Sequence, residues 1–371
     1  MHDHGVELPR SRTVVRMLSA IVIPLALATV VGLVWLWPTE SPAGTVMATG
    51  EQVRIELGTV TGISGGDAMT SPEVTMRLDE EGVEVPLHVP PEIAASGMSE
   101  GDRVKAIFNP VGLDAGAPYI FWDFERSTPL GLLALAYLAV VALVARWKGL
   151  AAVVGLGLSL AVVMFFMLPA LLAGSSPLAV ILTGAGAMMF ASIYLAHGIS
   201  VRTTTAVLGT AAGLIVTIIL AHLVTDRASL SGAWSADAGM LISYGLRLDH
   251  ILMCGMVLAG LGALNDVTIT QVSTVWELRL ANPAANTAAL FRQGMIVGRD
   301  HIASTVYTLA FAYVGTALPL LLAAALVDRS LLDTLTAAQV AEEIARTLVA
   351  SIGLILAIPL TTAIAARLAR A

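Results

Sequence analysis

The sequence predicts an α-helical protein that crosses a membrane several times and carries one small β domain outside the bilayer. Of its 371 residues, 57% are apolar and only 13% are charged, whereas soluble domains carry about 25% charged residues. A soluble chain of this size could not cover its surface with so few charges. The composition therefore excludes an ordinary soluble enzyme and a disordered chain. The net charge of −7 also excludes a basic nucleic-acid-binding protein.

Eight apolar stretches, each of about 20 residues, are long enough to span a bilayer. They are Met17–Trp37, Pro129–Ala145, Leu150–Ala173, Leu178–Ala196, Thr204–Val224, His250–Ile269, Ala303–Val327 and Leu348–Ala366. The first stretch is too long for the core of a signal peptide, and no cleavage motif of small residues sits neatly behind it. We therefore expect a retained anchor at residues 1–38, with cleavage as the alternative.

The distribution of basic residues predicts the orientation of these spans, because cytoplasmic loops are enriched in Lys and Arg. With the N-terminus inside, the inner segments hold Arg10, Arg12, Arg16, Arg146, Lys148, Arg202, Arg279, Arg292, Arg299, Arg367 and Arg370. The short outer loops hold only Arg227, Arg247, Arg329 and Arg346. Both termini are therefore expected in the cytoplasm, which requires an even number of spans.

Residues 39–128 differ from the rest of the chain, because acidic residues concentrate there and apolar residues alternate with polar ones. Strand-like alternation covers Gln52–Thr61, Glu73–Leu78, Val83–Val89 and Arg103–Phe108, with Gly-containing turns between them. About five short strands in such a length are typical of a small barrel of OB type. Its acidic charge disfavours oligonucleotide binding. We expect a structural or protein-docking domain, with ligand or peptide binding as the alternative.

An aromatic and charged segment, Tyr119–Arg126, leaves this domain just before the second span. Its position fits an interfacial anchor, and a role in gating or substrate contact is the alternative. The remaining residues, 129–371, form the transmembrane domain, with a cytoplasmic segment near 270–300. Within that segment Asn282-Pro283-Ala284 is expected to end one helix and to start another over Ala284–Gly294.

The sixth and seventh spans carry the polar residues that best fit a function inside the membrane. Asp266, Thr270, Ser273 and Glu277 are spaced i, i+4, i+7 and i+11, which places them on one helical face. Asn265, Thr268 and Gln271 widen this polar surface, and the returning span opens with further charged and hydroxyl residues. The candidates for transport or proton relay are Asp266, Thr270, Glu277, Asp300, His301, Ser304, Thr305, Thr308 and His197.

Two interpretations of these residues stay open. In the structural one, Asp266 and Asp300 pair with Arg279, Arg292 or Arg299, and the hydroxyls hold helices together. In the functional one, Asp266 is a protonatable or cation-binding group in a transport path, because carboxylates inside a membrane are costly and usually functional.

Sequence motifs disfavour an enzyme. The single cysteine, Cys254, excludes an internal disulfide and a Cys-based metal site, and no cofactor or metal is predicted. HExxH is absent, and so is the GxGD sequence expected of an intramembrane aspartyl protease. The first hypothesis is thus a proton- or cation-coupled transporter or exporter of an unknown small solute or ion, and a homo-oligomer is compatible with it. The second is a membrane scaffold whose outer β domain docks a partner protein.

Four segments resemble the YibE/F-like family of bacterial multi-pass membrane proteins. They are FWDFER (121–126), AHGISVRTTTAVLGT (196–210), GALNDVTITQVSTVWEL (262–278) and GRDHIASTVYTLAFAYVGTALPLLL (298–322). The resemblance covers about 40–325 and implies a bacterial plasma-membrane protein with an N-terminal anchor, a small extracytoplasmic β domain and a multi-span region. It implies no biochemical activity. Residues 265–279 are also similar to part of Sec-accessory and RND-type proton-driven proteins, which favours proton coupling.

Overall fold

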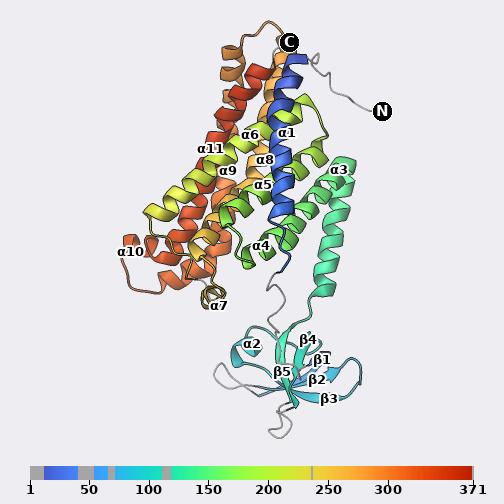
Figure 1. The fold of residues 1–371 in the computed structure, drawn as a ribbon. Helices are drawn as coiled ribbons and strands as arrows, with labels where there is room; N and C mark the ends of the chain where they lie inside the picture. The colour runs from blue at the N-terminus through green and yellow to red at the C-terminus, as the bar shows by residue number, and fades with distance from the viewer. Residues whose placement is uncertain (1–11, 41–53, 66–71, 111–117, 235–236, 370–371) are drawn as a thin grey trace. The chain divides into compact units, whose positions relative to one another are not determined.

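The computed structural model describes residues 12–40, 54–65, 72–110, 118–234 and 237–369 (Figure 1). The chain divides into two compact units. The smaller is Gly44–Val144, and the larger combines Met1–Ala43 with Ala145–Ala371.

Five strands of the smaller unit close into a barrel in the order β1-β2-β3-β5-β4. They are β1 (Arg54–Ser64), β2 (Glu73–Leu78), β3 (Glu84–His88), β4 (Arg103–Phe108) and β5 (Tyr119–Phe124), with the short helix α2 (Pro91–Ala95) between β3 and β4. Along β2, Val74, Met76 and Leu78 are buried and alternate with exposed residues, as expected when one face of a strand fills a barrel. The predicted small barrel is confirmed.

The fifth strand, β5, lies in the segment that the sequence indicated as an interfacial anchor. It pairs antiparallel with β4 and parallel with β3, and these pairings close the barrel. Tyr119 is buried, and its ring centroid lies 5.2 Å from that of Phe108. At least this aromatic residue therefore belongs to the barrel core, whereas Trp122 is 45% exposed.

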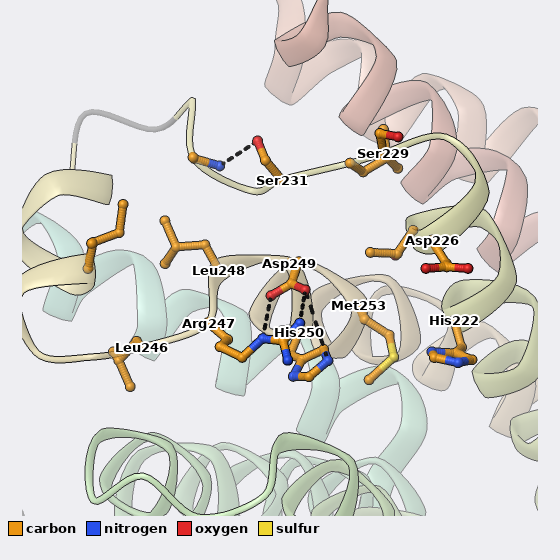
Figure 2. A pocket seen from close by; sticks show the side chains of 14 residues that line it. His222, Asp226, Ser229, Ser231, Leu246, Arg247, Leu248, Asp249, His250 and Met253 are labelled. Atoms are coloured by element: carbon orange, nitrogen blue, oxygen red, sulfur yellow. Dashed lines mark hydrogen bonds and ion pairs between the residues drawn. The ribbon is translucent and has the colours of Figure 1, made fainter.

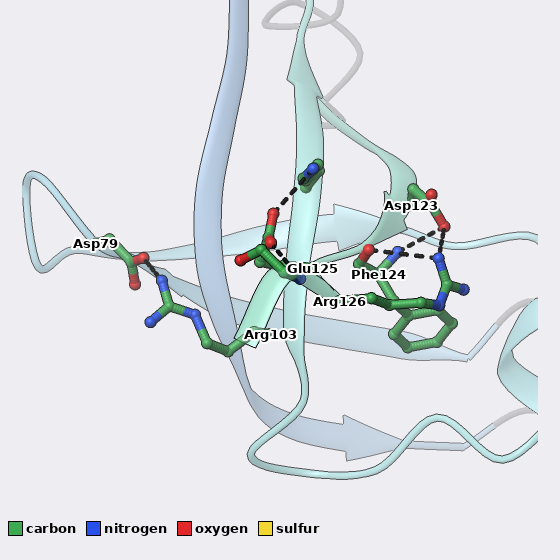
Figure 3. A network of polar contacts seen from close by, with 8 residues as sticks. Asp79, Arg103, Asp123, Phe124, Glu125 and Arg126 are labelled. Atoms are coloured by element: carbon green, nitrogen blue, oxygen red, sulfur yellow. Dashed lines mark hydrogen bonds and ion pairs between the residues drawn. The ribbon is translucent and has the colours of Figure 1, made fainter. Parts of the chain in front are cut away.

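Beyond β5, the carboxylate of Glu125 joins the barrel to the first turn of helix α3 (Ser127–Val162), as Figure 3 shows. It lies 2.9 Å from Lys105 Nζ on β4 and accepts the backbone N–H of Ser127 at 2.8 Å. Hydrogen bonds from Ser127 and then Lys105 lower the pKa of Glu125 to about 2. Next to it, Asp123 accepts a hydrogen bond from Arg126 at 2.7 Å, which lowers the pKa of that carboxyl as well.

Seven of the described helical stretches are long and apolar enough to cross a membrane. They are α1 (Arg12–Trp35), the stretch Ser127–Leu172, α5 (Pro177–His197), α6 (Val201–Arg227), α8 (Leu248–Ala281), α9 (Thr287–Ala325) and α11 (Ala338–Leu368). The stretch Ser127–Leu172 comprises α3, the π-helical segment Val163–Met167 and α4 (Leu168–Leu172), and the short helices α7 (Ala238–Ser243) and α10 (Leu331–Leu335) lie in connections.

Two boundaries differ from the sequence prediction. The second and third predicted spans fall in one stretch of 46 residues, within which the backbone leaves helical geometry at Arg146 (φ 53°, ψ −140°). The predicted break at Asn282–Ala284 is confirmed, because α8 ends at Ala281 and the next helix, α9, begins at Thr287. The predicted end of this second helix at Gly294 is wrong, because α9 continues without a break to Ala325. The side chain of Asn286 caps its start by accepting the N–H of Ala289 at 2.8 Å, and no proline follows until Pro319.

Helices α6, α8 and α11 pack against one another at the centre of the larger unit (Figure 1). Helix α9 contacts α8 and α11, α5 contacts α8, and α1 contacts α5 and α6. Leu18 near the start of α1 belongs to the same buried cluster as Ile269 of α8 and Ala366 near the end of α11. The start of α1 and the end of α11 therefore lie at the same end of the bundle.

Candidate functional site

The polar face predicted on the sixth span lies on α8, which is helical from Leu248 to Ala281. Asp266 and Glu277 are exposed and Thr270 is partly buried, so this face turns away from the centre of the bundle. Among the described residues, none forms a hydrogen bond or an ion pair with the carboxylate of Asp266.

Ionisable side chains from α5 and α6 lie near this part of α8. The charges of Arg202, Lys148 and Asp266 all act on the imidazole of His197, the last residue of α5. Arg202, in the first turn of α6, also lies 4.0 Å from Glu277, measured from Nη1 to Oε1. The structure thus groups three predicted candidates, His197, Asp266 and Glu277. Within the described ranges, no three His, Cys, Asp or Glu side chains are placed to hold a metal ion.

The candidates on the seventh span lie on α9 and divide between two faces. His301 and Thr305 are partly buried, whereas Asp300, Ser304 and Thr308 are exposed. Each hydroxyl donates to a carbonyl one turn earlier in its own helix, with distances of 3.3 Å for Ser304, 2.8 Å for Thr305 and 3.2 Å for Thr308. Such bonds satisfy a hydroxyl without a partner helix. No hydrogen bond or ion pair between described residues joins this group to Asp266.

Arg279, one of the arginines expected to pair with an intramembrane carboxylate, binds backbone carbonyls instead. Its side chain is only 6% exposed, and Nε donates to the carbonyl of Ala369 at 2.7 Å. Its Nη1 donates to the carbonyls of Pro283 at 3.0 Å and Ala285 at 2.7 Å. The guanidinium therefore fastens the end of α8 to the α8–α9 connection and to the end of α11.

A line of buried polar side chains, which the sequence pattern did not reveal as such, runs between α6, α8 and their neighbours. The hydroxyls of Thr210 on α6 and Thr268 on α8 are 2.6 Å apart, and both residues are 0% exposed. Thr268 donates its one hydrogen to the carbonyl of Asn265 at 3.1 Å, so Thr210 is the donor within the pair. Asn265 in turn donates Nδ2 to Ser192 Oγ of α5 at 2.7 Å.

Gln271 continues this line toward α9. It is 2% exposed, and Nε2 donates to the carbonyl of Gly294 at 2.7 Å. The sequence indicated Thr268 and Gln271 only as residues that widen the polar surface of this span. The structure places both of them inside the bundle, where they join α8 to α6 and α9.

Helices α6 and α11 approach so closely that a glycine of one faces a threonine of the other. A Cβ added at Gly209 would clash with Thr361, and one added at Gly353 would clash with Thr217. Thr217 donates to the carbonyl of Gly213 in its own helix at 2.9 Å. Thr361 is 0% exposed, and its hydroxyl has no hydrogen-bond partner in the described part of the chain.

One sequence signal could have revealed this buried line. Thr203, Thr210 and Thr217 recur every seven residues on α6, which keeps them on one face of the helix. All three are at most 1% exposed, so the stripe faces the neighbouring helices.

Comparison with known proteins gives one match. The family model of the YibE/F-like protein matches residues 133–371, which include α5, α6, α8, α9 and α11 and begin beyond the barrel. Neither the comparison with curated proteins nor that with solved structures gave a match. Because the family model covers more than half of the 371 residues, this chain belongs to the YibE/F-like family.

Proposed function

We propose that this chain is a secondary transporter or exporter of the bacterial plasma membrane, rather than an enzyme, and that it is coupled to protons or cations. The buried hydroxyl of Thr361, which has no hydrogen-bond partner among the described residues, is the observation that carries the proposal. A hydroxyl that only holds helices together is bonded across the interface or back to its own helix. In this proposal α6 and α11 separate enough at Thr361 to admit a water molecule, an ion or a proton carrier, which then bonds the hydroxyl.

The cluster of Asp266, His197 and Glu277 at one end of the bundle supports the same proposal. Asp266 is exposed and without an ion pair among the described residues, and its charge acts on His197. A carboxylate near the edge of the bilayer with a titratable imidazole beside it fits a site that takes up or releases protons. In this proposal Asp266 is the central carrier, His197 and Glu277 are its neighbours, and Thr270 contributes an oxygen.

We further propose eight crossings with both termini in the cytoplasm. The 46-residue stretch Ser127–Leu172 would measure about 69 Å as one straight helix, more than twice the roughly 30 Å of a bilayer core. Its break at Arg146 allows two crossings. An even number of crossings also agrees with the start of α1 and the end of α11 lying at the same end of the bundle.

We also propose that α9 contacts a second copy of the chain. Within the 18-residue apolar stretch of this helix, only 6% is buried inside the chain. Asp300, Ser304 and Thr308 lie on its exposed face. Polar side chains of membrane helices usually face protein or water rather than lipid. A homo-oligomer in which α9 faces its symmetry mate would remove these three candidates, together with the neighbouring His301 and Thr305, from the lipid.

Proton flux in liposomes tests the proposal. The purified chain is reconstituted around a pH-sensitive dye, and Asp266→Asn, Asp300→Asn and Thr361→Val are compared with the original chain. We expect each variant to lose most of the flux. Thr362→Val is the matched control for Thr361, because Thr362 is equally buried but its hydroxyl already bonds the carbonyl of Ile358 at 2.7 Å. Normal flux in correctly folded Asp266→Asn and Thr361→Val variants would exclude the proposed path.

Exposed apolar side chains on the outside of the barrel favour a second candidate function, that of a membrane scaffold. Ile55 and Leu57 on β1 and Ile120 and Trp122 on β5 are between 37% and 49% exposed. Strand β4 pairs with both β1 and β5, so the four apolar side chains lie on the two strands that flank β4. Unchanged flux in every variant above, together with loss of a cross-linked partner in Trp122→Ser, would favour the scaffold.

A further inference from the structure

A cavity of about 560 Å³ lies at the other end of the bundle from His197, where α6 ends and α8 begins (Figure 2). Its size falls in the range of about 300–1,000 Å³ that is usual for pockets that bind small molecules. The described loop between α6 and α7 forms part of its wall.

This loop is fastened to α11, so the cavity is built into the fold. The N–H of Gly232 donates to Glu342 Oε1 at 2.8 Å. The side chain of Gln339 donates to the carbonyl of Trp234 at 2.7 Å. Each of these two hydrogen bonds joins the loop to a residue of α11 that lies about a hundred positions later in the sequence. Together they hold the loop over the end of α6.

Three polar side chains from a single turn of α6 line the cavity. His222, Thr225 and Asp226 are spaced i, i+3 and i+4, which places them on the same side of the helix. Thr225 is only 8% exposed, and its hydroxyl has no hydrogen-bond partner within the described ranges. The carboxylate of Asp226 is exposed and also makes no hydrogen bond or ion pair with a described residue (Figure 2).

The facing wall, at the start of α8, is electrically balanced. Asp249 Oδ2 lies 2.7 Å from Arg247 Nη2 and 4.0 Å from His250 Nε2. The ionisable groups that line the cavity are His222, Asp226, Arg247, Asp249 and His250. Apart from the two histidines, the lining groups are one arginine and two carboxylates, so the carboxylate of Asp226 has no arginine or lysine to balance it among the residues that line the cavity.

We propose that this cavity binds a small organic cation through its ammonium group. An ammonium has three N–H donors and no acceptor. The turn of α6 offers it the carboxylate of Asp226 and the hydroxyl of Thr225, which no described residue pairs. The carbon skeleton of the ligand contacts the apolar part of the lining, which includes Leu230, Ile242 and Met253. A bare metal ion fits less well, because no three described His, Cys, Asp or Glu side chains are placed to ligate one.

Ligand-detected NMR on the purified full-length chain in detergent tests the proposal with n-butylammonium as the probe. 1-Butanol is its neutral counterpart and pentanoate its anionic counterpart. We expect saturable binding of n-butylammonium alone. Because a hydrogen bond to a charged group contributes about 1.5–3 kcal/mol and a neutral one about 0.5–1.5, Asp226→Asn should weaken binding by roughly 10- to 100-fold. Thr225→Val should weaken it by roughly 2- to 10-fold.

Two controls make the result specific. Asp237→Asn removes an exposed carboxylate of the same connection that does not line the cavity, and it should leave the affinity unchanged. Thr225→Ser keeps the hydroxyl and should bind as the original chain does. Equal binding of 1-butanol, no effect of Asp226→Asn, or Asp226-dependent binding of Zn²⁺ without any binding of n-butylammonium would overturn the proposal. Equilibrium binding in detergent requires no transport, so this inference and the proposed function can fail separately.

Discussion

Replacing Arg279 of α8 by methionine should destabilise the helical bundle more than replacing the exposed Arg292 of α9. Its buried guanidinium donates to three backbone carbonyls, those of Ala369, Pro283 and Ala285. Two of these acceptors lie in the α8–α9 connection, and the third is the residue that follows α11. Methionine fills a similar volume but leaves all three carbonyls without this donor.

The expected magnitude follows from the three hydrogen bonds. Each bond to a charged group contributes about 1.5–3 kcal/mol, so the three together set an upper limit of roughly 5–9 kcal/mol. Removing the guanidinium also removes the cost of burying its charge, and the carbonyls can bind water at the end of the bundle, so we expect a net loss of about 3 kcal/mol. Arg279→Lys keeps the charge without the planar fork of donors and should lose about 1–2 kcal/mol.

Reversible unfolding in mixed micelles with increasing SDS, followed by far-UV circular dichroism, measures these differences. Arg292→Met is the matched control, because Arg292 lies on the same hairpin but is exposed, and it should change the free energy of unfolding by less than about 0.5 kcal/mol. Equal stabilities of Arg279→Met and Arg292→Met would refute the argument that the three carbonyl contacts stabilise the bundle. A larger loss in Arg279→Lys than in Arg279→Met would refute the role of the charge.

Two further predictions concern the helix contacts and the barrel. Gly353→Ala should destabilise the bundle by about 1–3 kcal/mol through overpacking against Thr217. Added to Gly353→Ala, Thr217→Ala should restore most of the lost stability, whereas Thr217→Ser should not. The same unfolding assay measures these differences. Because the folded-state pKa of Glu125 is lowered from 4.5 to about 2, its stabilisation of the barrel is complete above pH 4.5 and is lost as the pH falls toward 2. Urea unfolding of the full chain at pH 6 and pH 3, followed by Trp122 fluorescence with the other tryptophans replaced, measures this loss. The drop in the free energy of unfolding between the two pH values should be smaller in Glu125→Gln than in the original chain. An equal drop in both would contradict the prediction.

Periodicity and length predict most of the fold but not all of its boundaries. The long apolar stretches locate the membrane helices because a helix that spans a bilayer needs many consecutive apolar residues. Alternation locates β2, whose buried and exposed residues follow each other strictly. It fails for β5, because Tyr119–Phe124 reads YIFWDF and contains only one charged residue. A strand that is aromatic on both faces has the composition of an interfacial anchor, and only its pairing with β3 and β4 identifies it.

The candidate site shows a similar limit of helical spacing. Spacing correctly places Asp266 and Glu277 on one face of α8, since helical geometry alone determines it. Spacing does not tell which side of the helix meets its neighbours. Thr268 and Gln271 are therefore indistinguishable in the sequence from exposed polar residues, although they are at most 2% exposed. The partners that bury them, Thr210 and Gly294, are far away along the chain.

The distinction between structural and functional hydroxyls in this bundle depends on where each hydrogen goes. Thr210 donates to Thr268, and Thr362 donates to a carbonyl of its own helix. Both hydroxyls are explained by helix packing alone. Within the described part of the chain Thr361 gains no such bond. Burying an unpaired hydroxyl costs about 1–3 kcal/mol that a valine of similar shape would avoid. Packing between α6 and α11 therefore does not account for a hydroxyl at Thr361, whereas in the proposed transport path a water, proton or ion would supply the missing partner.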